Sequence, residues 1–149
     1  MDARDLMINN YVQLPCGSIV QVKEISFIDE NDEWIMFYPR INDSESIVLN
    51  DVRPIIINDY WLNYFKFECI ESVKKSITDI VYIHKEWILH DWFLLEKEDQ
   101  DIDAENIGVI SEDDTSYDVS INNKYITCIS HVHQLQNLYK LLSYREQLI

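Results

Sequence analysis

The sequence predicts an α+β fold: mostly antiparallel sheet, with a short helix in the middle of the chain and an amphipathic helix at its C-terminus. Short runs of β-branched and aromatic residues recur between turn-forming residues, as in small antiparallel sheets and barrels. One stretch near the end has apolar residues at helical spacing. With 149 residues, 47% of them hydrophobic, the chain can bury a core. We expect one compact domain over residues 1–149. The alternative is a division into a β-rich part, residues 1–70, and a sheet with the last helix, residues 76–149.

The first third of the chain has the pattern of short strands separated by turns. Pro15 and Gly17 supply turn chemistry between the first two strands. A small SH3-like barrel is one arrangement that strands of this length and spacing would fit. The expected β-runs are residues 10–14, 19–25, 34–38, 47–49 and 52–57.

A short helix is predicted after these strands. Asn58 is a good N-cap, and Asp59 is favourably placed in the first turn. Trp61, Leu62 and Phe65 would share one face of this helix, which we expect to end near Phe67.

The second half is predicted to be β-rich. Residues 80–95 read as one or two strands with a bend near Glu86 or at His90-Asp91, and a helix is the competing interpretation. Asn122-Asn123 is expected as a hairpin turn within residues 117–128. The other expected elements are an acidic loop over residues 96–106, a strand at 107–110 and a polar turn at 112–116.

The C-terminal segment carries the clearest helical pattern. Ser130 is a suitable N-cap, and one apolar stripe follows it. We expect the stripe to pack on the protein's own sheet. Its members are Val132, Leu135, Leu138, Tyr139 and Leu142.

Charge disfavours several classes of partner. The chain has 27 acidic and 12 basic residues, for a net charge of −15. Because nucleic-acid affinity comes mainly from cationic side chains that neutralise phosphates, direct DNA or RNA binding is disfavoured. Anionic membrane surfaces are disfavoured for the same reason. No apolar run approaches a membrane span and no signal peptide is visible, so the expected location is cytoplasmic. Cys16, Cys69 and Cys128 are expected as buried free thiols.

No catalytic or metal-binding motif stands out. Asp99, Asp101 and Asp103 alternate as in the first half of a calcium loop, but Ala104 and Ile110 occupy the positions that need Gly and Glu. His131 and His133 are two apart, which on a helix does not favour chelation of one ion. His84 and His90 cannot be placed well enough to join them. Cys128 lies in an apolar strand pattern, typical of a core residue rather than a nucleophile. We therefore expect a non-enzyme with no cofactor and no metal ligands.

Three segments resemble a family of short uncharacterised proteins of Bacteroides-type bacteria, their prophages and mobile elements. They are residues 3–12, residues 52–67 and the closing His-Val-His-Gln-Leu-Gln-Asn-Leu-Tyr at 131–139. The sequence departs from the family at two glycine positions, which hold Asn9 or Asn10 and Lys66. The resemblance does not extend over residues 96–116, and it brings no activity or catalytic residues.

These observations favour a non-enzymatic protein-interaction or accessory protein, of phage or mobile-element origin. The alternatives are an acidic nucleic-acid mimic that inhibits a DNA-binding protein, and an unrecognised enzyme whose site is assembled from distant residues. The partner is expected to be a protein. The expected contact residues are the acidic side chains of two loops: Asp99, Asp101, Asp103, Glu105, Glu112, Asp113 and Asp114.

Overall fold

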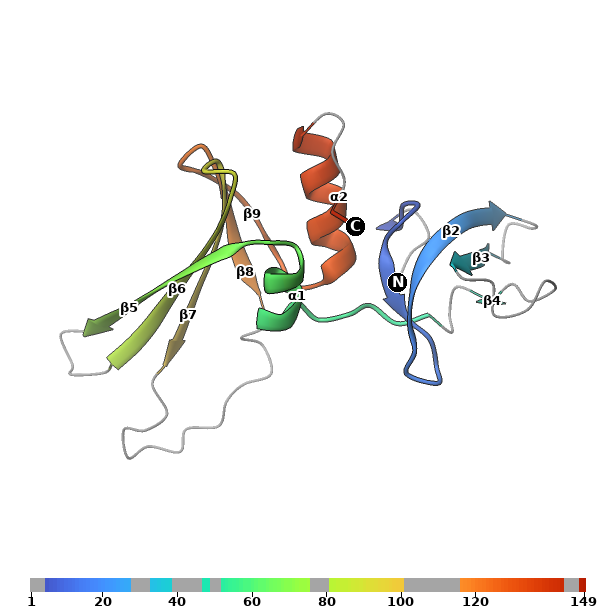
Figure 1. The fold of residues 1–149 in the computed structure, drawn as a ribbon, viewed down its shortest axis with the longest axis horizontal. Helices are drawn as coiled ribbons and strands as arrows, with labels where there is room; N and C mark the ends of the chain where they lie inside the picture. Colours follow the sequence, from blue (N-terminus) through green and yellow to red (C-terminus); the bar gives the residue numbers. More distant parts are fainter. Residues whose placement is uncertain are drawn as a thin grey trace. The chain divides into compact units, whose positions relative to one another are not determined.

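The fold is that of a computed structural model, which describes residues 5–27, 33–38, 47–48, 52–75, 81–100, 116–143 and 148–149. The described elements form two antiparallel sheets and two helices, so the predicted α+β class is confirmed (Figure 1). In chain order they are β1 (Tyr11–Gln13), β2 (Ile19–Phe27), β3 (Glu33–Tyr38), β4 (Ile47–Val48), α1 (Asp59–Tyr64), β5 (Glu68–Lys75), β6 (Val81–Leu89), β7 (Phe93–Gln100), β8 (Tyr117–Ile121), β9 (Lys124–Ile129) and α2 (Val132–Ser143).

The chain divides into two compact units. Unit 1 comprises Met1–Ile57 with His131–Ile149, and unit 2 comprises Asn58–Ser130. The last helix therefore groups with the N-terminal strands. The expected single domain over residues 1–149, and its alternative division, stay predictions.

Unit 1 contains an open four-stranded sheet in the order β1-β2-β3-β4. A single bridge joins Gln13 of β1 to Arg53, and among the described residues β1 and β4 do not pair. A closed barrel needs continuous pairing around the sheet, so the SH3-like barrel is wrong for the described strands. The run at 52–57 forms isolated bridges at Arg53 and Ile56 rather than a strand.

Alternating apolar residues of β1 and β2 supply a core to this sheet. Val12 lies opposite Val20 in the register, and both are buried. Because side chains alternate across a strand, Val22 joins Val20 on the same face. The core cluster consists of Leu6, Val12, Leu14, Val20, Val22 and Val52.

Helix α2 buries part of the apolar stripe that its spacing predicted, since Leu138 and Leu142 are only half-buried. Val132, Leu135 and Tyr139 are buried. The helix begins at Val132, so the residue that precedes it is His131 rather than the expected cap Ser130. Two polar side chains of α2, His133 and Gln136, are also buried.

Unit 2 is a five-stranded meander in the order β5-β6-β7-β8-β9. Strands β6 and β7 are joined by a turn in which His90 and Asp91 have φ of 55° and 65°. The competing helix for residues 80–95 is therefore wrong, and of the two predicted bends the one at His90-Asp91 is confirmed. The predicted Asn122-Asn123 turn between β8 and β9 is also confirmed, with positive φ at both residues.

One face of this sheet, called the apolar face, forms the core of unit 2. Phe67 packs edge-on against Phe93 with ring centroids 5.8 Å apart. Lys85, on the same face by alternation, pairs with Asp59 of α1 at 3.3 Å, so α1 lies over this face. Its buried strand residues are Trp87, Leu89, Phe93, Leu95, Tyr117, Val119 and Ile129.

Helix α1 has well-defined caps at both ends. As predicted, Asn58 is the N-cap, and its side chain accepts a hydrogen bond from Trp61 N–H. At the other end Lys66 N–H donates to Asn63 O and Phe67 N–H to Leu62 O, which is the Schellman pattern. Lys66 has a φ of 69°, where glycine is the usual residue. The helix ends at Tyr64, earlier than the expected Phe67.

Three expectations from the sequence need correction. Strand β5 was not predicted, because none of its described side chains is buried and its sequence lacks an apolar alternation. Residues 96–100 are not loop but the second half of β7, paired with β6. The thiols expected to be buried are free and exposed: Cys16 lies in the turn after β1, Cys69 on the edge strand β5, and Cys128 opposite the exposed Asp118 rather than on the apolar face.

Candidate functional site

The hairpin β6–β7 brings one histidine and three glutamates together. His84 and Glu86 are two residues apart on β6, and so are Glu96 and Glu98 on β7. The register pairs His84 with Glu98 and Glu86 with Glu96. Since residues two apart share a face of a strand, all four lie opposite the apolar face. We call this surface the carboxylate face; it also includes Asp118 of β8, which pairs with Glu96.

His84 lies at the centre of this group and is only 5% exposed. Its Nε2 lies 3.2 Å from Glu86 Oε1 and 3.6 Å from Glu96 Oε2. Its Nδ1 lies 3.3 Å from Glu98 Oε1, yet this buried nitrogen makes no hydrogen bond of acceptable geometry. A buried ring nitrogen without a hydrogen bond is costly, and a water or an ion beside the ring is one arrangement that relieves such a cost.

A pocket of about 260 Å³ opens beside His84. It is lined by Ser116, which precedes β8, and by Asp118 of β8, together with Glu96, Lys97 and Glu98. Glu86, Glu96 and Asp118 form one row across three neighbouring strands. Like charges directly opposite each other destabilise a sheet, so this row has a cost that a bound cation would offset.

The donor set defines what the site could hold. Within the residues that the structure describes, the ligand atoms of His84, Glu86 and Glu96 all lie within 4.8 Å of one another. Imidazole nitrogen with carboxylate oxygen suits zinc and other divalent transition-metal ions. The same groups could instead hold a protonated imidazole by ion pairing.

A second feature of unit 2 is the edge strand β5. It pairs with β6 over eight consecutive residues without a register shift, and among the described residues nothing pairs with its outer side. Ile70 is 53% and Val73 is 73% exposed. The opposite edge, β9, has a register irregularity, which is one way in which proteins protect sheet edges. Strand β5 is therefore the more regular of the two edges.

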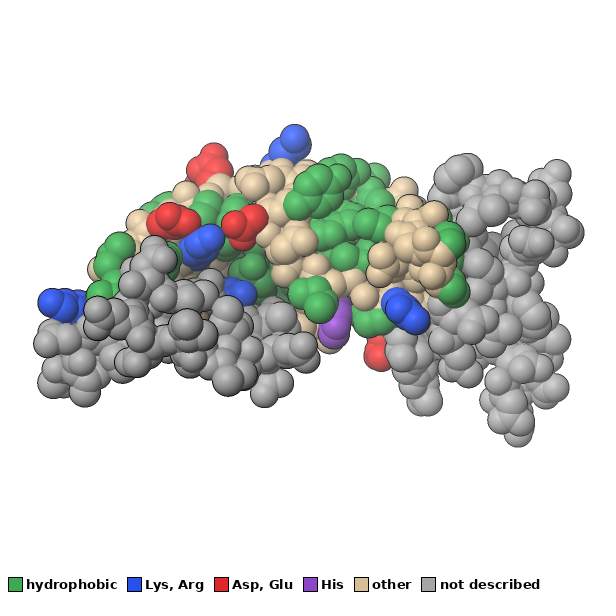
Figure 2. Space-filling view, turned by 90° about the horizontal axis from the view of Figure 1, so that it is seen from below, with side chains coloured by type: hydrophobic (Ala, Val, Ile, Leu, Met, Phe, Trp, Pro, Cys, Tyr) green, Lys and Arg blue, Asp and Glu red, His purple; other side chains and the backbone are tan. Residues whose placement is uncertain are grey.

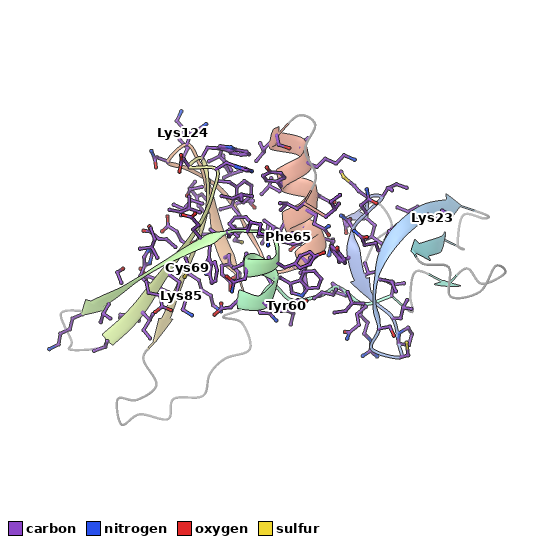
Figure 3. All side chains as sticks on the ribbon, viewed as in Figure 1. Lys23, Tyr60, Phe65, Cys69, Lys85 and Lys124 are labelled. Atoms are coloured by element: carbon purple, nitrogen blue, oxygen red, sulfur yellow. The ribbon has the colours of Figure 1, made fainter. Side chains whose placement is uncertain are left out.

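Charges around β5 are balanced rather than uniformly acidic. Lys85 Nζ, on β6, lies 3.3 Å from a carboxylate oxygen of Asp59 in α1 and 3.3 Å from one of Glu71 in β5. Lys85 also lies next to Cys69 (Figure 3). Asp59 and Glu71 raise the pKa of Lys85 even though its burial acts to lower it. Burial, followed by the Glu71 charge, raises the pKa of the Cys69 thiol. On the face drawn in Figure 2, basic side chains likewise stand beside acidic ones.

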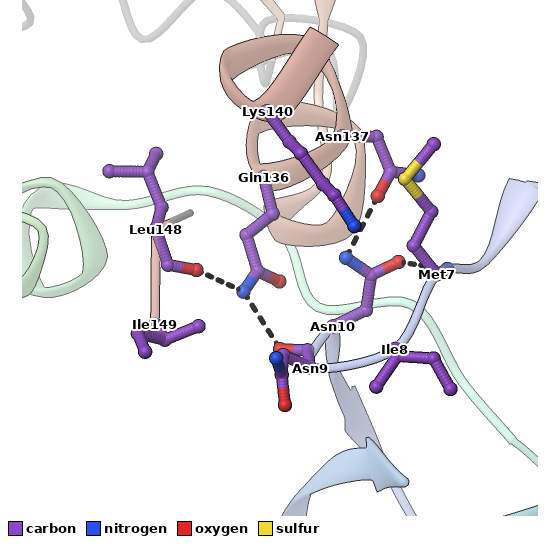
Figure 4. Close-up of a pocket in the computed structure, with 9 residues that line it drawn as sticks. All are labelled: Met7, Ile8, Asn9, Asn10, Gln136, Asn137, Lys140, Leu148 and Ile149. Carbon is purple, nitrogen blue, oxygen red and sulfur yellow. Dashed lines mark hydrogen bonds between the residues drawn. The ribbon is translucent and has the colours of Figure 1, made fainter. Parts of the chain in front are cut away.

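In unit 1, side chains of the opening and closing segments bond to one another (Figure 4). Gln136 accepts from Tyr11 N–H and donates to the carbonyls of Asn9 and Leu148 at 3.0 and 2.7 Å. Asn10 Nδ2 donates to Asn137 Oδ1 at 2.9 Å. The hollow between these residues measures only about 10 Å³, roughly the room that one water needs. These polar residues of the closing motif are therefore structural.

The two histidines of unit 1, His131 and His133, do not form a comparable site. His131 and His133 stack at 5.8 Å between ring centroids. Burial, followed by the charge of His131, lowers the pKa of His133 to about 4, although Asp5 opposes this. His133 is thus neutral at ordinary pH.

The acidic residues expected to contact a partner cannot be assembled into a site. Asp99 lies in β7, without a described side chain, while Asp101, Asp103, Glu105, Glu112, Asp113 and Asp114 lie outside the described residues. Instead, His84, Glu86, Glu96 and Glu98 come together, a grouping that the sequence pattern did not predict. The sequence does carry one signal for this grouping: His84 and Glu98 are equally far from Asp91 along the chain, and so are Glu86 and Glu96.

Neither described helix has the length and apolar character needed to cross a bilayer. No family model, curated protein or solved structure matches this chain.

Proposed function

We propose that the chain is a non-enzymatic protein-binding protein, and that β5 receives an extended segment of its partner as an added strand. The observation that supports this is the exposed edge of the five-stranded sheet, which is eight residues long and, among the described residues, is paired only on its inner side. Strand addition at such an edge is a recurring mode of peptide recognition, in which main-chain hydrogen bonds provide affinity.

The exposed side chains of β5 indicate the chemistry of the partner. Ile70 and Val73 lie on opposite faces of the strand, so an added strand would cover each with an apolar side chain of its own. Glu68 and Glu71 would favour basic residues opposite the first half of β5. A net charge of −15 would also attract a basic protein at long range. The proposed partner is therefore a basic protein with an extended, partly apolar segment.

A photo-crosslinking experiment tests this proposal. The photoreactive residue p-benzoylphenylalanine is introduced at position 73 of the full chain, and at position 125 on the opposite edge as a control, since Tyr125 is 63% exposed. We expect a protein to crosslink from position 73 and not from position 125.

The crosslinked protein is then purified and its affinity measured. Ile70→Lys/Val73→Lys should weaken binding at least about tenfold, which corresponds to about 1.4 kcal/mol. The matched variant Tyr125→Lys/Ile126→Lys, with the same added charge, should bind as the wild type does. Equal crosslinking at both positions, equal affinity of both variants, or a second copy of this chain as the crosslinked species would contradict the proposal.

The phage or mobile-element origin belongs to the same proposal and is supported only by the sequence resemblance. The nucleic-acid mimic and the unrecognised enzyme stay predictions. Most of the acidic residues on which the mimic depends, those within 101–114, lie outside the described residues.

A further inference from the structure

We propose that His84, Glu86 and Glu96 bind a divalent transition-metal ion, zinc foremost, on the carboxylate face of unit 2. This inference is independent of strand addition at β5, because none of the three residues belongs to that strand.

The spacing of the ligand atoms fits such an ion. Ligands that bind zinc tetrahedrally at about 2.0–2.1 Å lie about 3.3–3.4 Å from one another. His84 Nε2 is 3.2 Å from Glu86 Oε1 and 3.6 Å from Glu96 Oε2. The three side chains project from two directly paired strands, so the sheet holds them in position without a loop.

The buried imidazole provides the second, independent observation. His84 is 5% exposed, and its Nδ1 has no hydrogen bond although Glu98 Oε1 is 3.3 Å away. With an ion at Nε2, the imidazole is neutral and its single ring proton moves to Nδ1. That N–H then donates to Glu98 after a small rotation. A carboxylate that orients a ligating histidine in this way is typical of protein zinc sites.

Charge also favours an ion at this position. Two carboxylates and a neutral imidazole carry −2, which one divalent cation neutralises. Glu86 and Glu96 lie directly opposite each other on neighbouring strands, and a cation between them would offset their mutual repulsion. Imidazole nitrogen among the ligands favours zinc over magnesium or calcium, which prefer oxygen alone.

The pocket beside His84 and Glu96 leaves room for a fourth ligand. Asp118 and Ser116 line that pocket, so either Asp118 or a water completes the tetrahedron. The competing arrangement has no ion: a protonated His84 is held by ion pairs to Glu86, Glu96 and Glu98, and both of its ring nitrogens then keep their protons.

Calorimetric titration of the metal-stripped full chain with zinc chloride tests the proposal. We expect one ion per chain with a dissociation constant below about 10 μM. His84→Gln and Glu86→Gln/Glu96→Gln should each weaken binding at least about thirtyfold. His90→Gln, on the exposed turn of the same hairpin, and Glu68→Gln, an exposed carboxylate on β5, are matched controls and should bind as the wild type does.

Histidine ring NMR of the wild-type chain gives a readout that does not depend on a variant folding. Zinc should shift the Nε2 resonance of His84 and leave its Nδ1 protonated. Absence of binding, equal binding by the His84→Gln variant, or a doubly protonated His84 ring that zinc does not change would overturn the proposal.

Discussion

Acidification should destabilise unit 1 through a single histidine, His133 of α2. Its side chain is 5% exposed, and its Nδ1 makes no hydrogen bond. Burial, with the neighbouring His131, lowers its pKa from 6.5 to about 4. We therefore consider a decrease in pH from 7.5 to 4. Within this interval His133 is protonated in the unfolded chain and neutral in the folded chain.

The size of the effect follows from the two pKa values. Between pH 6.5 and 4 the unfolded chain binds a proton at His133 that the folded chain does not, so the free energy of unfolding falls as pH falls. The contribution of His133 is fully present above about pH 6.5 and is lost towards pH 4. At about 1.36 kcal/mol per pKa unit, the loss is about 2 kcal/mol at pH 5 and about 3 kcal/mol at pH 4.

Urea unfolding at pH 7.5 and pH 5, followed at the amide resonances of α2, measures this loss. Other groups also titrate in this range. The relevant quantity is therefore the change in the free energy of unfolding between the two pH values in wild type, minus the same change in the His133→Gln variant. We expect a difference of about 2 kcal/mol. Because each protein is compared with itself, any destabilisation by the substitution cancels. Equal changes in the two proteins, or an NMR titration of the His133 ring near pH 6.5, would refute the reasoning.

Three further predictions concern local features. Lys66→Gly should stabilise unit 2 by about 1 kcal/mol in urea unfolding, because glycine adopts the positive φ of this Schellman position without strain. Gln136→Leu should destabilise unit 1 by about 3 kcal/mol in the same assay, since it leaves Tyr11 N–H and the carbonyls of Asn9 and Leu148 without their partner. Iodoacetamide should modify Cys16 faster than Cys69 by peptide mass spectrometry at pH 7.5, because hydrogen bonds from Ser18 lower the pKa of Cys16 whereas burial raises that of Cys69. Equal rates at the two thiols, or no change in stability on either substitution, would contradict the corresponding argument.

The sequence predicted those parts of the fold that depend on local chemistry. Asn58 caps α1 because an Asn side chain can accept a hydrogen bond from the first turn whatever the surroundings. Asn122 and Asn123 form a hairpin turn because Asn tolerates a positive φ. The same tolerance applies to Asn9, which has a φ of 73°.

Features that depend on pairing between distant residues were missed. Strand β5 has exposed side chains on both faces, so its sequence carries no burial pattern. Glu96 and Glu98 suggested a solvated loop because of their charge, whereas pairing with β6 makes that segment a strand. Cys128 looked apolar from its neighbours, yet the register places it opposite Asp118.

The candidate metal site depends on register in the same way. His84 could be assigned no partners until the centre of the β6–β7 turn was known. A shift of one residue would place the four side chains on different faces. Once Leu89 is paired with Phe93, the pairs Glu86–Glu96 and His84–Glu98 follow by counting away from the turn along each strand.

The hydrogen bonds between the two ends of unit 1 have a consequence for the order of events during synthesis. Unit 2 is continuous and is complete once Ser130 has been made. Unit 1 must wait for α2, because Gln136 bonds to Asn9, and for Leu148, which bonds to Gln136. Domains fold as units while the chain emerges from the ribosome. The inserted unit is therefore able to fold first, and the strands that precede it in the chain are completed last.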